Sequence, residues 1–421
     1  MMNKLFIKLA TVAAALSVLA IMCSACTLIP SKQVCGKWEI SADELTEDIE
    51  KGNYKSAEPN DEFIVATADF SIDLFKRSID EHDSSMISPL SVMLALGMTA
   101  NGASGDTLAQ MEQTLAGGMP IDELNGYYKG LIDRLQSNGK CKLSIADSIW
   151  LRDRIAEDVN EDFLKKTAGN YYAQVYKAPF DDSTTSDING WVNNNTDGMI
   201  DKIIDKIDQD CVMYLINAIA FDAEWQDIYS ENEVRDRDFT DIDGDTHKVS
   251  MMFSEENMYI SGENVTGFVK PYDGEYSFVA LLPDENISLD EYVDSLDGQT
   301  FIDLMNNVEY TSVDTGLPKF KTEYEIGMVE ILKAMGMTDA FTGNADFSNM
   351  LEGLHIDEVL HKTYIEVDEK GTKAGAVTVV AMCESAVLEE YKEVILDRPF
   401  VYAIIDDETK LPVFIGTVTD I

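Results

Sequence analysis

The side chains that could carry out catalysis are few and widely spaced in this sequence. Four histidines, His82, His247, His355 and His361, are available as imidazole bases. The chain contains no Gly-x-Ser-x-Gly nucleophile elbow, no His-Glu-x-x-His zinc motif and no phosphate-binding loop. Acidic residues number 77, so pairs of carboxylates occur throughout the chain and do not single out a glycosidase site. We therefore expect a protein that is not an enzyme.

One short acidic run has the alternating aspartates that begin a calcium-binding loop. It comprises Asp241, Asp243 and Asp245. The glutamate that such a loop carries at its twelfth position is missing, and a solvated turn is the simpler interpretation. We expect no metal and no other cofactor.

Composition narrows the possible partners. The chain has 421 residues, with 32 basic side chains against 77 acidic ones and a formal net charge of -45. Such an acidic protein is repelled by a phosphate backbone, so we expect no nucleic-acid partner. Hydrophobic residues make up 45% of the chain, which is enough for a packed core and argues against disorder.

The N-terminus has the pattern of an export signal. Lys4 and Lys8 precede an apolar stretch over residues 9–22, and small residues lead to Cys26. A cysteine in this setting resembles a bacterial lipobox, in which the chain is cleaved before the cysteine and lipid is attached to its sulfur. We favour a lipoprotein-type signal over residues 1–25, with lipid on Cys26. An ordinary signal peptide and an uncleaved anchor are the alternatives.

All three interpretations export the protein, either to the extracellular space or to the cell surface. They bring it to a membrane only through the N-terminal lipid or anchor. The residues that follow are acidic and nearly free of large apolar side chains. We therefore expect residues 26–60 to form a solvated tether.

Hydrophobic periodicity predicts the elements that must position any site. A helix is expected from Asp61, because Phe63, Ala66, Phe70 and Leu74 recur at spacings of three and four. Further helices are expected after Pro89 and from Asp106. Strands are expected over residues 143–151, 213–221, 278–282 and 401–405, and helices over residues 289–296 and 324–335. Strands and helices mix without strict alternation, which favours the α+β class.

A segment near the C-terminus could serve either as a loop or as a strand. If a strand begins at Thr372, one of its faces carries only small or apolar side chains. These inward residues are Thr372, Ala374, Ala376, Thr378, Val380 and Met382. The segment is rich in Gly and Ala, and no proline occurs in residues 371–397. Such a segment can enter a sheet without burying a charge or losing a ladder bond.

At this point the chain resembles the serpin family, over residues 61–421. The hinge resembles that of the family in Glu369, Gly371, Thr372, Ala374, Gly375 and Ala376. Ser88 and Ser91 match the family's shutter helix, Asn217 and Trp225 match the strand that ends at the breach, and His361 matches the shutter histidine. Further matches are the Leu-Leu-Pro-Asp motif from Leu281, the Leu-Pro-Lys-Phe motif from Leu317, and the two C-terminal motifs from Arg398 and Pro412.

The resemblance implies a fold and an activity. The fold would be one domain with a large central mixed sheet, two smaller sheets, eight or nine helices and an exposed reactive-centre loop at about residues 369–397. The activity would be suicide inhibition of a serine protease: the protease forms a covalent acyl-enzyme with the loop, and the cleaved loop inserts into the central sheet. We expect a monomer. A non-inhibitory binding or carrier protein and an inhibitor of a cysteine protease are the alternatives.

The family's hinge spacing puts the scissile bond between Ser385 and Ala386. The loop is a few residues longer than usual, so Met382-Cys383 and Val387-Leu388 are competing bonds. No Arg or Lys lies between Lys373 and Lys392, so a trypsin-like pocket has nothing to bind. Small and medium side chains favour elastase-like or subtilisin-like proteases.

Overall fold

The computed structural model describes residues 33, 34, 36–80, 82–136, 141–208, 210–372 and 392–421. The chain divides into two compact units, residues 1–40 and 41–421. In the first unit, β1 (Gln33–Val34) and β2 (Lys37–Trp38) pair as an antiparallel hairpin. The expected signal and the proposed lipid site, Cys26, lie outside the described residues. No described helix has both the length and the apolar character to cross a membrane.

The second unit is built around a seven-stranded mixed sheet, which we call the central sheet. Its strands are, in order, β14 (Phe320–Gly327), β15 (Glu358–Val367), β16 (Gly371–Thr372), β7 (Met213–Glu224), β5 (Lys142–Arg152), β6 (Gln174–Ala178) and β3 (Asp43–Glu44). Buried and half-buried side chains alternate along β15. Every second residue of this strand therefore faces the core.

Two smaller sheets complete the β structure. The six-stranded sheet contains β10 (Tyr259–Gly262), β11 (Val265–Pro271), β12 (Tyr276–Pro283), β18 (Phe400–Asp406), β19 (Pro412–Val418) and β4 (Ser85–Ile87). The four-stranded sheet contains β17 (Glu393–Ile395), β13 (Val313–Pro318), β9 (Thr246–Glu256) and β8 (Val234–Thr240). Strands β12 and β18 are buried along their whole length, which explains why both appear in the sequence as continuous apolar runs.

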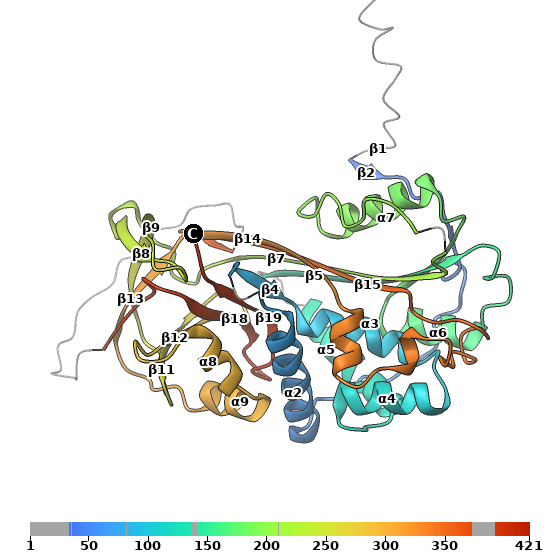
Figure 1. Ribbon diagram of the computed structural model, residues 1–421, viewed down its shortest axis with the longest axis horizontal. Helices are drawn as coiled ribbons and strands as arrows, with labels where there is room; N and C mark the ends of the chain where they lie inside the picture. The colour runs from blue at the N-terminus through green and yellow to red at the C-terminus, as the bar shows by residue number, and fades with distance from the viewer. Residues whose placement is uncertain (1–32, 35, 81, 137–140, 209, 373–391) are drawn as a thin grey trace, which may run out of the picture. The chain divides into compact units, whose positions relative to one another are not determined.

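Nine α-helices occur in the described part of the chain. They are α2 (Asp61–Ser78), α3 (Pro89–Ala100), α4 (Gly105–Ala116), α5 (Ile121–Gln136), α6 (Glu161–Asn170), α7 (Asp182–Asn195), α8 (Leu289–Ser295), α9 (Gly298–Asn306) and α10 (Val329–Ala334). Helices α3, α5 and α6 lie on one side of the central sheet and α7 on the other (Figure 1). Every residue of α3 is buried, because this uncharged helix packs behind the sheet. The expected α+β class is confirmed, with one large and two smaller sheets in the second unit.

The acidic segment before α2 differs from the solvated tether expected over residues 26–60. From Ser41 onward the chain belongs to the second unit, and β3 pairs with β6 at the edge of the central sheet. The ring of Tyr54 covers Gly169, where a Cβ would come within 2.5 Å of it. The backbone N–H of Ala57 donates to the carbonyl of Gly126 at 2.8 Å. Main-chain bonding, contact with glycine and the packing of Leu45 and Ile49 against the core hold this segment in place.

The strand predictions are confirmed in β5, β7, β12 and β18. The helix expected over residues 324–335 is wrong in its first half. Strand β14 extends to Gly327 and pairs with β15, and the helix is confined to Val329–Ala334. Pairing with a strand distant in sequence overrides the local pattern here.

Candidate functional site

The central sheet is split at one end by the start of the expected reactive-centre loop. The two residues of β16 lie between β15 and β7, and Thr372 pairs with Val367 on one side and with Ala223 on the other. Further down, β15 and β7 pair directly as parallel strands, residues 358–362 with residues 214–218. Strands β15 and β7 are thus separated by β16 where the loop begins, and they pair directly with each other further along the sheet.

Both residues of β16 are specified by their surroundings. Gly371 has φ +154°, and a Cβ there would lie 2.1 Å from the carbonyl oxygen of Ala223. Only glycine fits this position. The Thr372 side chain is buried, and its hydroxyl lies 2.6 Å from the hydroxyl of Tyr272. Thr372 therefore faces inward, as its small side chain predicted.

The turn that joins β15 to β16, residues 368–370, is held by Trp225 and Tyr229. The Trp225 indole N–H donates to the carbonyl of Asp368 at 2.9 Å, and its backbone N–H donates to the carbonyl of Lys370 at 2.8 Å. The backbone N–H of Tyr229 donates to the carbonyl of Glu369 at 2.9 Å. Three successive carbonyls of this hinge turn are thus bound by one short segment of chain.

The hinge turn carries one ion pair at its surface. Glu369 binds Lys319, and the hydrogen bond from this lysine lowers the pKa of the Glu369 carboxyl. Both side chains are about one-third exposed, so solvent screens much of their attraction. The other expected hinge residues, Ala374, Gly375 and Ala376, lie outside the described residues. The same holds for Met382, Cys383, Ser385, Ala386, Val387 and Leu388, the candidates for the reactive bond.

Below the split, the expected shutter residues meet in one buried hydrogen-bonded network. The Ser91 hydroxyl donates to the Asn217 side-chain oxygen, and the Asn217 amide donates back to the Ser91 carbonyl at 3.0 Å. His361 Nδ1 lies 3.1 Å from the same Asn217 oxygen. The backbone N–H of Ser88 donates to His361 Nε2 at 3.0 Å.

These contacts fix the protonation of the histidine. Because Nε2 accepts from a backbone N–H, Nδ1 carries the proton and donates it to Asn217. Burial lowers the pKa of His361 to about 3, so the imidazole is neutral at physiological pH. His361 and Asn217 lie opposite each other in the β15–β7 pair, at the point where an incoming strand must separate them.

One further member of this network, Asp147, was not expected from the sequence. Its carboxylate accepts a hydrogen bond of 2.6 Å from the Asn217 amide, and its side chain is 3% exposed. Burial raises the pKa of Asp147 to about 7, although the hydrogen bond from Asn217 opposes the rise. A charged residue inside the predicted strand over residues 143–151 was the available signal. Its partner became visible only with the register of β5 against β7, which sets Asp147 opposite Asn217.

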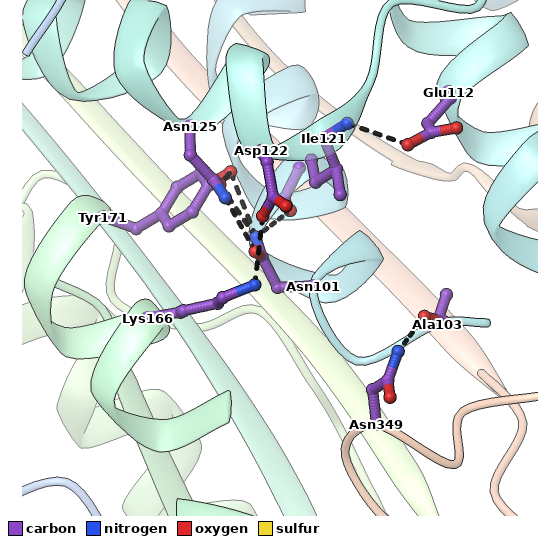
Figure 2. A network of polar contacts seen from close by, with 10 residues as sticks. Asn101, Ala103, Glu112, Ile121, Asp122, Asn125, Lys166, Tyr171 and Asn349 are labelled. Carbon is purple, nitrogen blue, oxygen red and sulfur yellow. Dashed lines mark hydrogen bonds and ion pairs between the residues drawn. The ribbon is translucent and has the colours of Figure 1, made fainter. Parts of the chain in front are cut away.

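A second polar network joins the helices behind the central sheet (Figure 2). The side-chain amides of Asn101 and Asn125 donate to each other at 2.9 and 2.8 Å, and the Tyr171 hydroxyl donates to Asn125 at 2.7 Å. All three side chains are buried. They tie the end of α3 to α5 and to the residue that follows α6, which fixes the support on which the sheet rests.

The acidic run at Asp241 forms the turn between β8 and β9. Its carboxylate accepts from the backbone N–H groups of Asp243 and Asp245 and lies 2.7 Å from His247 Nε2. Within the described ranges no group of three or more His, Cys, Asp and Glu side chains is arranged to hold a metal ion.

Comparison with known proteins gives a family match over most of the chain. Residues 65–421 match the family model described as serpin (serine protease inhibitor). Human neuroserpin is 29% identical over 378 residues, which cover 84% of this chain and 90% of neuroserpin. The alpha-1-antiproteinase of Rattus norvegicus is 26% identical over 366 residues, which cover 84% of this chain and 88% of that protein.

Among solved structures, the thermophilic serpin tengpin in its native state is similar at 52% identity and TM-score 0.86, covering 90% of this chain and all of tengpin. Human thyroxine-binding globulin complexed with thyroxine is 24% identical, with TM-score 0.78, and covers 85% of this chain and 98% of its own. This second likeness shows the fold alone. The chain belongs to the serpin family, whose members are in general inhibitors of proteases and not catalysts.

Proposed function

We propose that this protein is a suicide inhibitor of extracellular serine proteases with elastase-like or subtilisin-like specificity. The cleaved reactive-centre loop enters the central sheet and traps the acyl-enzyme before water can release it. The observation that carries the proposal is β16, in which the first two residues of the loop already form a strand paired on both sides. The inserting strand therefore has a preformed start and a defined direction.

The register of β16 predicts how far insertion proceeds. Continued in the same register, residue 376 lies between Thr363 and Ile219, and Thr378 lies between His361 and Asn217. Insertion must therefore break the direct contact of these two shutter residues. Residue 382 comes level with Met213, the first residue of β7. The inserted part of the loop thus spans residues 371–382.

The energetics favour this movement. Ten more residues in a central strand form about twenty backbone hydrogen bonds, while the direct pairing of β15 with β7 loses about five. At ~1 kcal/mol net for each bond, the gain is on the order of 10–15 kcal/mol. Core-facing side chains of Thr, Ala, Val and Met add apolar burial without a buried charge. Such a gain is large enough to deform the active site of a tethered protease.

Comparison with tengpin supports an uninserted starting state. The TM-score is 0.86 with native tengpin and 0.77 with latent tengpin, at 52% and 50% identity. The expected export signal puts the inhibitor outside the cell, and the loop residues near Ser385 suit proteases that accept small side chains.

A protease panel scored for complexes that survive SDS tests the proposal. We expect the full chain to form such a complex with an elastase-like or subtilisin-like enzyme, and mass spectrometry of the released peptide to show cleavage after Ser385. Replacing Thr372 with Arg puts a charge where the buried threonine contacts Tyr272, so this variant should be cleaved without forming the complex. An equal yield of complex from Thr372→Arg would refute insertion, and no complex with any protease would favour a binding protein.

A further inference from the structure

A buried ion pair lies beneath the hinge turn, between the six-stranded and four-stranded sheets. The ammonium of Lys270 in β11 lies 2.6 Å from a carboxylate oxygen of Glu256 in β9. Lys270 is 1% exposed and Glu256 is 8% exposed. Removing both charges from water costs free energy that apolar residues of similar size would not incur. Stability alone is therefore a poor explanation for the Lys270–Glu256 pair.

The buried ammonium lies against two aromatic rings. It is 4.4 Å from the ring centroid of Tyr229 and 5.6 Å from that of Trp225. Both distances are within the range of cation–π attraction, which is strengthened when the cation is shielded from water. Glu256 also accepts a hydrogen bond of 2.6 Å from the Ser254 hydroxyl. The ammonium is thus held by the Glu256 carboxylate and by two aromatic rings.

The same two aromatic residues hold the hinge turn. Their backbone N–H groups and the Trp225 indole donate to the three carbonyls of residues 368–370. The Trp225 ring also stacks on Tyr272 at 4.4 Å between centroids, and Tyr272 in turn contacts Thr372. A continuous chain of contacts therefore leads from Lys270 through the two aromatic residues to the three residues of the hinge turn, 368–370, and to Thr372, the first inward residue of the loop.

We infer that Lys270 is a positioning residue for loop insertion. Its ammonium, oriented by Glu256, fixes Trp225 and Tyr229 so that the turn over residues 368–370 stays formed and β16 remains in place as the start of the inserting strand. The inference deepens the proposed function and rests on it. Without the cation the turn loosens, insertion begins later, and more of the acyl-enzyme is hydrolysed before it is trapped.

The test compares the full chain with a double variant, Glu256→Gln and Lys270→Met, which removes both charges without leaving one buried alone. Hydrogen exchange measured by mass spectrometry reports on the backbone N–H groups of Trp225 and Tyr229 in the absence of any protease. We expect at least ten-fold faster exchange at these groups. With a protease that forms the complex, we expect the number of inhibitor molecules consumed per complex to rise at least three-fold, while the association rate constant changes less than two-fold.

A matched control removes another largely buried ion pair, between Arg134 and Asp406, through Arg134→Met and Asp406→Asn. This control lowers stability away from the hinge and should leave exchange at Trp225 and Tyr229 unchanged. Lys270→Arg, which retains a cation over the rings, should keep most of the wild-type protection of these two N–H groups from exchange. Wild-type exchange in the double variant, or equal acceleration in the control pair, would overturn the inference. Exchange needs no protease, so failure of the inhibitory function would be seen separately as the absence of any complex.

Discussion

Replacing Asp147 with Asn tests whether the shutter contains a buried carboxyl that titrates near neutral pH. The Asn217 amide donates to Asp147 at 2.6 Å, and the side-chain oxygen of an asparagine can accept the same hydrogen bond. Burial raises the pKa of Asp147 from 3.8 to about 7. His361 stays neutral from pH 5 upward because its own pKa is lowered to about 3. The variant thus changes one titration and retains the geometry.

The sign of the effect follows from the raised pKa. The folded protein binds this proton more tightly than the unfolded chain, so the stabilisation from Asp147 is fully present below about pH 4 and is lost as the pH rises through about 7. A shift of about 3 units corresponds to about 4 kcal/mol as an upper limit. At pH 8 the free energy of unfolding of the Asp147→Asn protein should therefore be about 2–4 kcal/mol higher than that of the wild type. Near pH 5 the difference should fall to about 1–2 kcal/mol.

Urea denaturation of both proteins at half-unit steps from pH 5 to pH 8.5 measures this difference. The exposed Asp243→Asn serves as the control, since it removes one carboxylate without changing a buried contact. We expect the difference between wild type and Asp147→Asn to grow up to about pH 7 and to level off above it, while the control follows the wild type. A difference that is constant over the whole range would show that Asp147 does not titrate in the shutter.

Two glycine substitutions test the close backbone contacts. Gly130→Ala brings a Cβ within 2.3 Å of the Ala57 carbonyl oxygen and should detach residues 41–60. Urea titrations should then show a free energy of unfolding about 1–3 kcal/mol lower than that of the wild type. An unchanged free energy of unfolding would mean that this segment does not dock in solution. Gly371→Ala puts a Cβ 2.1 Å from the Ala223 carbonyl oxygen and should displace β16. At least three times more inhibitor molecules should then be cleaved for each complex formed. An unchanged number of molecules cleaved per complex would argue against a preformed start of insertion.

Much of the fold follows from local pattern in the sequence. The helix α2 shows the expected spacing of apolar residues, and the all-apolar β12 and β18 are the expected short runs. The inward direction of Thr372 also agrees with the prediction from side-chain size. These features depend on residues close together in the chain, where periodicity and side-chain volume are visible.

The remaining features depend on partners far apart in the sequence. Strand β14 resembled a helix until its pairing with β15 was known. The acidic segment after Ser41 contacts the domain through its backbone, through glycines and through the apolar side chains of Leu45 and Ile49, which are too few to form a detectable pattern. Asp147 and Asn217 are 70 residues apart, and the Lys270–Glu256 pair joins two different sheets. Charge and spacing alone could not have brought these residues together.

The thermal stability of the loop-cleaved protein tests the central claim most directly. Cleavage in residues 383–391 by a protease that is not trapped should release the loop, and insertion over residues 371–382 should add on the order of 10–15 kcal/mol. For a domain of this size about 1 kcal/mol raises Tm by roughly 1–2 °C, so Tm should rise by about 15–25 °C. A cleaved protein that melts at the temperature of the intact one, or below it, would contradict loop insertion.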